Sequence, residues 1–236
     1  MDTIELWSGS TKALISTQGA WLTNLSDQYG DVLFPKRRLT NASGDIKERG
    51  GCHVCLPNFG PGGDSGLPQH GFGRIMTWEI KEQSADMVRL KLPEGPASYT
   101  ALESTLEYLV GDAQLTMSLG VRNTGAGQLQ IAPAFHPYFA TGNDSSVDID
   151  DKMHLLDQLD PMSLLADVQH ITINKRTIRL HSSGATEWAI WSDRLAPYVC
   201  VEPTTAGESF IAPEQPANSV LQAGETKTLS LTISWK

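Results

Sequence analysis

Two short segments hold residues whose types suit acid–base chemistry. Glu202 ends the apolar strand pattern YVCVEP (198–203), and apolar neighbours raise the pKa of a carboxyl group toward the range useful for a base. His136 lies within the aromatic stretch AFHPYFA (134–140), either as a general acid of a sugar pocket or as a hydrogen-bonded core histidine. Both assignments stay open at this stage, because a glutamate at the end of a strand also escapes to solvent.

A third segment, GLPQHGFGR (66–74), places polar side chains between glycines. If the chain is extended here, His70, Phe72 and Arg74 share one face, and the two glycines between them let a ligand or another backbone come close. The segment ends a longer stretch, residues 50–74, with eight of the 21 glycines and three of the 13 prolines. A loop of this length inside a compact domain is functional or disordered. Its aromatic residues and histidines favour function.

Positive charges gather near this loop although the chain is acidic. Lys and Arg total 18 and Asp and Glu total 27, so the formal net charge is −9, which argues against a nucleic-acid surface. A cluster of cations before and within the loop predicts either a local anion site or a solvated surface. Its members are Lys36, Arg37, Arg38, Lys47, Arg49 and Arg74.

The cysteines predict neither a metal site nor a disulfide framework. Cys52 and Cys55 form a C-x-x-C pair, but a structural zinc site needs a second pair and only Cys200 remains. We therefore expect three buried, unreactive thiols and no metal. The odd number of cysteines and an N-terminus without the apolar core of a signal peptide indicate a cytoplasmic protein.

Other kinds of site find no support in the sequence. It holds no G-x-S-x-G or S-x-x-K nucleophile motif, and no phosphate-binding loop or dinucleotide fingerprint follows a predicted strand. No apolar run approaches the ~18 residues that a membrane helix needs. We expect a protein that works without a cofactor and without a nucleic acid or a membrane as partner.

Short strands must position the candidate residues. Most of the chain alternates apolar and polar residues with period two between turn residues. This pattern predicts an all-β fold with little helix, an antiparallel sandwich or barrel that residues 1–236 form as one domain. Residues 153–168 are the best helical candidate, and Pro161 interrupts them. The clearest predicted strands cover residues 105–110, 114–121, 177–182, 188–192, 198–202 and 228–235.

Five segments together resemble the aldose 1-epimerase superfamily, and more closely its hexose-6-phosphate mutarotase branch. In the family's order they are RGGCHVCLPNFGP (49–61), LPQHGFGRIMTWEI (67–80), AFHPYFA (134–140), WAIWSD (188–193) and YVCVEPTTA (198–206). The resemblance implies a large antiparallel β-sandwich of the galactose mutarotase-like type, in agreement with the strand pattern. It also implies an isomerase that interconverts the α and β anomers of aldoses without a cofactor.

The resemblance further implies roles for single residues. Glu202 would act as the general base on the anomeric hydroxyl, and His136 as the general acid on the ring oxygen. His70 would help to polarise that oxygen. Residues that would bind sugar hydroxyls or a phosphate are Arg49, Gln69, Arg74 and Asp167.

Two questions stay open from the sequence. The substrate is a free hexose or a hexose 6-phosphate, because the donor fork of an arginine suits hydroxyl and phosphate alike. The alternative function is a non-catalytic carbohydrate-binding module on the same sandwich, since a fold does not determine a function. In either case the expected partner is a small-molecule sugar or sugar phosphate, and the expected assembly is a monomer or a weak dimer.

Overall fold

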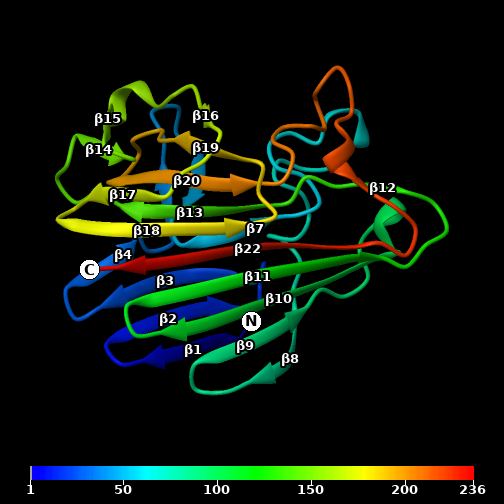
Figure 1. Ribbon diagram of the computed structural model, residues 1–236, viewed down its shortest axis with the longest axis horizontal. Helices are drawn as coiled ribbons and strands as arrows, with labels where there is room; N and C mark the ends of the chain where they lie inside the picture. The colour runs from blue at the N-terminus through cyan, green and yellow to red at the C-terminus, as the bar shows by residue number, and fades with distance from the viewer. Residues whose placement is uncertain (1) are drawn as a thin grey trace.

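Two antiparallel sheets of nine strands each build the fold (Figure 1), and the computed structural model describes residues 2–236. In the first sheet, eight strands follow the order β1-β2-β3-β4-β13-β20-β19-β16, and β7 pairs with β13 and β3. The bounds of these strands are β1 Thr3–Ser8, β2 Thr11–Ser16, β3 Trp21–Asp27, β4 Gly30–Leu33, β7 Cys52–Cys55, β13 Ala134–Ala140, β16 Ser163–Leu165, β19 Glu187–Trp191 and β20 Tyr198–Thr204.

The second sheet has the order β15-β14-β17-β18-β22-β11-β10-β9-β8. Its longest strands, β10, β11 and β22, are neighbours in the middle of the sheet. The bounds are β8 Glu79–Gln83, β9 Met87–Lys91, β10 Leu102–Gly111, β11 Gln114–Asn123, β14 Ser146–Ile149, β15 Lys152–Leu155, β17 His170–Ile173, β18 Arg176–Ser183 and β22 Thr226–Trp235.

Two small two-stranded sheets and four short turns complete the described chain. The pairs are β5 Arg37–Thr40 with β6 Ile46–Arg49, and β12 Leu129–Gln130 with β21 Val220–Leu221. The helical turns within residues 2–236 are all 3-10 turns: η1 Gly63–Ser65, η2 Ala97–Tyr99, η3 Leu156–Gln158 and η4 Ala217–Ser219. None of these has the length and apolar character needed to cross a membrane.

One apolar cluster fills the space between the two sheets. In β10 the side chains alternate, so that Leu106 and Tyr108 are buried while Leu109 is exposed. From the first sheet, Leu22 and Phe135 enter the same cluster. Because burial of apolar area is the main favourable term of folding, this period-two pattern determines which face of each strand points inward.

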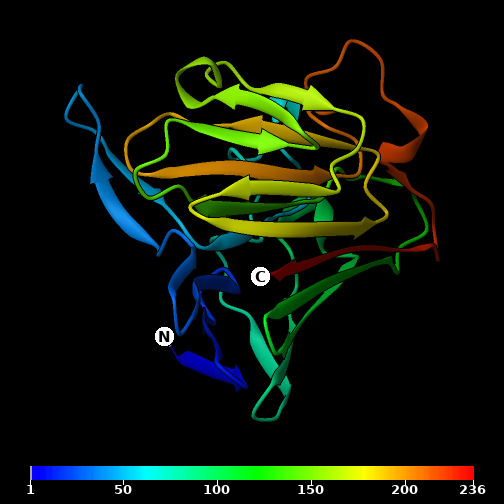
Figure 2. The same cartoon turned by 60° about the vertical axis from the view of Figure 1, so that its left-hand side comes forward.

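Strands β13 and β20 lie in the middle of the first sheet and are buried on both faces. Phe135 and Phe139 join the cluster between the sheets, whereas Tyr138 packs in a separate cluster on the opposite face. Loops and the β5–β6 hairpin cover parts of that opposite face, and the hairpin projects beside the sheets in Figure 2. The polar residues of β13 and β20 are therefore held on a face that the second sheet does not touch.

The structure confirms the predicted strands. All six exist, with ends that differ by three residues or fewer, the largest shift being the start of β10 at Leu102 instead of residue 105. The helical candidate 153–168 is wrong, because β15 and β16 flank the turn η3 there. Leu156 and Leu159, three residues apart, are buried by this single turn.

Residues 50–74 also differ from the expected continuous loop. Strand β7 lies inside this stretch and pairs His53 with His136. The condition of an extended chain at residues 70–74 is not met, because the chain turns there and His70 and Gly71 have φ angles of 61° and 71°. As a result Phe72 is buried in the cluster between the sheets and shares no face with His70.

Candidate active site

His136 and Glu202 face each other across neighbouring strands. The register that pairs Ala134 with Thr204 and Tyr138 with Cys200 places position 136 opposite position 202. The imidazole Nε2 of His136 lies 3.4 Å from Oε2 of Glu202, and the two side chains are 5% and 2% exposed. The strand therefore does not release Glu202 to solvent, and Pro203 does not end the strand, which continues to Thr204.

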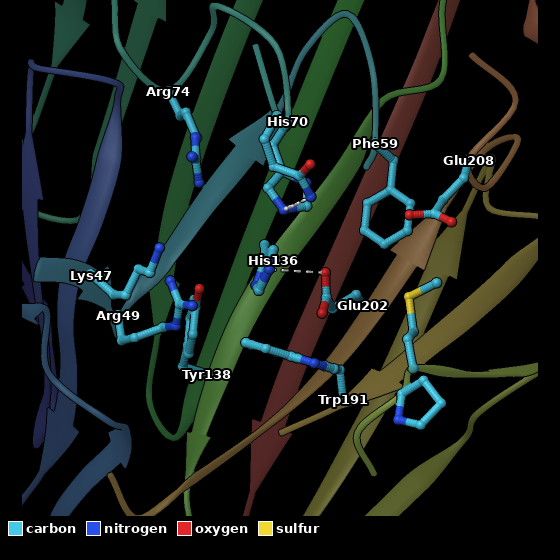
Figure 3. A pocket seen from close by; sticks show the side chains of 13 residues that line it. Lys47, Arg49, Phe59, His70, Arg74, His136, Tyr138, Trp191, Glu202 and Glu208 are labelled. Carbon is cyan, nitrogen blue, oxygen red and sulfur yellow. Dashed lines mark hydrogen bonds and ion pairs between the residues drawn. The ribbon is translucent and has the colours of Figure 1, made fainter. Parts of the chain in front are cut away.

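A cavity of about 620 Å³ opens above this pair (Figure 3). Its floor comes from β13, β19 and β20, and its walls come from the β5–β6 hairpin, the loop after β7 and the loops near residues 161 and 208. The lining residues are Lys47, Arg49, Phe59, Gln69, His70, Arg74, His136, Tyr138, Pro161, Met162, Trp191, Glu202 and Glu208. Polar groups thus converge on a hollow whose floor and sides include aromatic rings.

Burial favours the uncharged form of both members of the pair. It raises the pKa of Glu202 well above its ordinary value, and the positive charge of Arg49 opposes this shift. Burial also lowers the pKa of His136 well below its ordinary value, and His70 and Arg74 lower it further. Burial therefore favours a protonated carboxyl group of Glu202 beside a neutral imidazole of His136.

His70 is held as a neutral hydrogen-bond donor. The backbone N–H of Gly60 donates to its Nδ1 at 3.2 Å, so the ring proton is on Nε2. Burial lowers the pKa of His70 to about 3, and the charges of Arg74 and Arg49 add to the shift. Its ring meets that of His136 edge-on, with 5.1 Å between the ring centroids.

Arg49 enters the cavity from the end of β6. Its Nε donates to Oδ2 of Asp193 at 2.9 Å, and its guanidinium lies 5.3 Å from the ring centroid of Trp191. Asp193 also accepts a hydrogen bond from the hydroxyl of Tyr198. Nη1 of Arg49 donates to the carbonyl oxygen of Glu48 at 3.0 Å, so that among residues 2–236 the Nη2 edge is left for another partner.

Arg74 is held by a histidine that lies beneath the cavity. Nδ1 of His53 donates to the carbonyl oxygen of Val54 at 3.3 Å, so Nε2 carries the lone pair. Nη1 of Arg74 lies 3.4 Å from this Nε2 and donates to it. His53 is completely buried, and its ring lies 4.6 Å from that of His136.

The charged residues are ordered across the cavity. Figure 3 shows Glu202 near the centre with His136 beside it, and Lys47, Arg49 and Arg74 on the side of His136 that is away from Glu202. Glu208 lies on the opposite side, beyond Glu202. The site is therefore positive at one end and acidic at the other, with the histidine between.

The structure brings together six of the seven residues expected from the sequence. Arg49, Gln69, His70, Arg74, His136 and Glu202 all line the cavity. Asp167 does not, because it follows β16 and lines a different hollow with Gln169 and Arg179. It is the one expected sugar-binding residue that the fold places elsewhere.

Two other expectations can be compared with the structure. The three cysteines are buried and form no disulfide, as expected. Of the cations before the loop, only Lys47 and Arg49 reach the cavity, whereas the ammonium of Lys36 lies 3.8 Å from the ring centroid of Trp21. Lining residues without an expected role include Tyr138, Trp191 and Phe59, whose motifs stand out in the sequence, and Glu208, which has no sequence signal.

Comparison with known sequences identifies relatives. The model of the aldose 1-epimerase family matches residues 2–169. The chain is 29% identical over 157 residues to an Escherichia coli K12 protein named "Putative glucose-6-phosphate 1-epimerase", and 27% identical over 159 residues to a Salmonella typhimurium LT2 protein of the same name. Each alignment covers 63% of this chain and 52% of the relative, so the chain spans about half the length of these curated relatives.

Solved structures share the fold at low sequence identity. A galactose mutarotase-like protein from Lactobacillus casei superposes with a TM-score of 0.80 at 18% identity over 100% of both chains. A galactose mutarotase-like protein from Clostridium acetobutylicum gives 0.68 at 16% identity, over 99% of this chain and 95% of that one. The fold is therefore galactose mutarotase-like. With the family model matching residues 2–169, the chain belongs to the aldose 1-epimerase family.

Proposed function

We propose that this chain interconverts the α and β anomers of a hexose 6-phosphate, with Glu202 as general base and His136 as general acid. The observation that supports this most directly is the buried pair at the floor of a polar cavity, 3.4 Å apart. A carboxyl group and an imidazole at this spacing can serve two neighbouring oxygens, such as the C1 hydroxyl and the ring oxygen of a pyranose.

The reaction balances protons within the pair. In the reactive state Glu202 is a carboxylate and His136 an imidazolium. Glu202 takes the proton of the C1 hydroxyl while the bond from C1 to the ring oxygen breaks and His136 gives its proton to that oxygen. The products are the open-chain aldehyde, a protonated Glu202 and a neutral His136. Rotation about the C1–C2 bond and reversal of the steps close the other anomer.

Burial of the pair favours the ring-opened stage over the reactive ion pair, which is the minor form of the resting site. The neutral carboxyl group and neutral imidazole form the state that accompanies the open-chain aldehyde, and burial raises the pKa of Glu202 and lowers that of His136. The ring oxygen gains negative charge as its bond to C1 breaks. The Nε2–H of His70 is a neutral donor beside His136 and stabilises this charge.

The order of charges across the cavity supports a phosphorylated substrate. In a pyranose the C1 hydroxyl and the C6 group lie on opposite sides of the ring oxygen. With the hydroxyl at Glu202 and the ring oxygen at His136, the C6 group points toward the end that holds Arg49 and Arg74. The same end holds Lys47. Relatives at 29% and 27% identity bear the name of a glucose-6-phosphate 1-epimerase, which agrees with this orientation.

Replacing the base tests the reaction. We expect Glu202→Gln to lower the rate of anomer exchange of glucose 6-phosphate by about 10² to 10⁴-fold, because the amide cannot accept the proton. Exchange NMR spectroscopy measures this rate at equilibrium. The matched control is Glu187→Gln on β19, which does not line the cavity and keeps the wild-type rate. An unchanged rate in the folded Glu202→Gln variant would contradict the role of Glu202.

A comparison of sugars tests the substrate. Glucose, galactose and glucose 6-phosphate are compared at equal concentration, and we expect the highest kcat/KM for the phosphate. Arg74→Ala removes this preference and changes kcat/KM for glucose far less than kcat/KM for glucose 6-phosphate. Binding of these sugars without acceleration of anomer exchange would instead identify a non-catalytic carbohydrate-binding module.

A further inference from the structure

A third potential metal ligand lies against the acid–base pair. Cys200 precedes Glu202 by two residues on β20, so both side chains lie on the same face of the sheet. The ligand atoms of His136, Cys200 and Glu202 lie within 4.8 Å of one another, and all three residues are buried. Because they come from two paired central strands, they converge without any movement of a loop.

We propose that His136, Cys200 and Glu202 bind a zinc ion, and that this ion inhibits the enzyme. An imidazole, a thiolate and a carboxylate are the three ligand types of Zn²⁺, and a thiolate disfavours Mg²⁺ and Ca²⁺. Bonds of about 2.0 to 2.3 Å in a tetrahedral site place ligand atoms about 3.3 to 3.7 Å apart. The 3.4 Å between Nε2 of His136 and Oε2 of Glu202 already matches one edge of that tetrahedron.

Unpaired atoms and charge balance support the site. Within residues 2–236, Oε2 of Glu202 makes no hydrogen bond although its side chain is 2% exposed, and the Nε2 of His136 lies 3.4 Å from it without hydrogen-bond geometry. A neutral imidazole, a thiolate and a carboxylate together balance the two positive charges of the ion. A neutral complex suits a buried position, where an unbalanced charge is costly.

Coordination removes both proton-transfer groups from the reaction. The lone pairs of Nε2 and Oε2 enter bonds to the ion, and two protons pass to solvent, one from the thiol of Cys200 and one from the carboxyl group of Glu202. No atom is oxidised or reduced. His136 and Glu202 line the cavity, so the fourth position of the ion faces the space that the sugar occupies. Inhibition is therefore competitive with the sugar and rests on the proposed function, whereas zinc binding itself does not.

Zinc binding is measured on the purified protein by isothermal titration calorimetry. We expect one Zn²⁺ per chain, and at least tenfold weaker binding to Cys200→Ala. Cys52→Ala is the matched control, because Cys52 is an equally buried thiol that belongs to the core between the sheets. Equal affinity of the wild type and Cys200→Ala, or no binding to the wild type, overturns the proposal.

Two further readouts keep the test decisive. Co²⁺ bound to the wild type shows a thiolate-to-metal charge-transfer band, and its absence overturns the site even if Cys200→Ala fails to fold. Cys200 supplies no step of the reaction, so Cys200→Ala keeps the basal rate of anomer exchange and needs at least tenfold more Zn²⁺ for half-inhibition. Zinc binding in a protein that accelerates no anomer exchange leaves the zinc site standing and rejects the proposed reaction alone.

Discussion

At the residue scale, three neighbouring histidines have different tasks because each has a different hydrogen-bond environment. The ring centroid of His53 lies 4.6 Å from that of His136 and 5.7 Å from that of His70. His70 presents an N–H toward the cavity, whereas His53 presents a lone pair to Arg74. His136 alone has a carboxyl group beside it. The hydrogen-bond partners near each ring thus distinguish a donor at His70, an acceptor at His53 and, in the proposed reaction, a proton carrier at His136.

The acceptor role of His53 can be tested by its effect on Arg74. We expect His53→Leu to raise KM for glucose 6-phosphate by about tenfold, because a hydrogen bond to a charged group contributes roughly 1.5 kcal/mol or more. The kcat value and the KM for glucose change far less, since glucose has no phosphate for Arg74 to bind. Steady-state kinetics with both sugars measures the split. An equal fall in kcat/KM for glucose 6-phosphate and for glucose would mean that His53 acts through His136 instead.

Residue types predicted the pair but not its surroundings. Glu202 and His136 stood out because one ends an apolar strand and the other lies among aromatic residues. Nothing in the local sequence distinguished a buried Glu202 from a solvated one, because its burial comes from neighbouring strands and covering loops. Asp167 had only a loose motif, and its distance from the cavity follows from the path of the chain after β16.

At the element scale, a buried ion pair connects the two sheets. Asp27 ends β3 in the first sheet and accepts two hydrogen bonds of 2.7 Å from Arg176 at the start of β18 in the second. The indole N–H of Trp235 on β22 donates to the same carboxylate at 2.8 Å. The hydrogen bonds from Arg176 lower the pKa of Asp27 to about 2. One carboxylate thus holds the ends of three strands.

Acid should remove this connection. We expect Asp27→Asn to lower the free energy of unfolding at pH 7 by about 2 to 4 kcal/mol. The folded pKa is lowered, so the contribution is complete above the ordinary value of 3.8 and is lost as the pH falls toward about 2. Urea unfolding between pH 7 and pH 2 should show the wild type and the variant converging.

The matched control for this series is Asp31→Asn. Asp31 lies on β4 next to β3 and accepts a hydrogen bond of 2.9 Å from Asn24, which an asparagine oxygen also accepts. Its substitution should change stability by less than about 1 kcal/mol. A difference between the wild type and Asp27→Asn that stays constant down to pH 2 would contradict the ion-pair account.

The sequence predicted the strands of this protein better than its turns. Alternation marks a strand directly, because one face of each strand is buried. Residues 153–168 have leucines at helical spacing, yet a single 3-10 turn satisfies that spacing between two strands. The turn at His70 and Gly71 depends on positive φ angles at both residues. A positive φ is predictable at a glycine, but no residue pattern predicted it for His70. Tertiary contacts determine the backbone conformation of both segments.

At the scale of the whole molecule, a chain with a net charge of −9 presents a positive end of its cavity to the ligand. For the phosphorylated sugar proposed above, the overall charge would repel the anion at long range, while Lys47, Arg49 and Arg74 would attract it near the site. A cleft focuses the field of the charges that line it, so the local attraction determines capture.

Salt should therefore weaken capture of the phosphorylated sugar. Raising ionic strength from about 0.01 M to about 1 M shortens the Debye length from roughly 30 Å to 3 Å. We expect kcat/KM for glucose 6-phosphate to fall several-fold and kcat/KM for glucose to stay constant. Arg74→Ala reduces the salt dependence. A rise of kcat/KM for glucose 6-phosphate with ionic strength would mean that repulsion by the net charge of the molecule exceeds attraction by the cations of the cavity.

The register of β13 and β20 couples the position of Glu202 to the packing of the core between the sheets. A slip of one residue in β20 would turn Glu202 toward the core and Val201 toward the cavity. Burying that carboxyl group among apolar side chains costs several kcal/mol, which is a large part of the stability of a whole domain. The burial pattern of β20 therefore penalises a slip of one residue, so that the register that packs the core also places Glu202 beside His136.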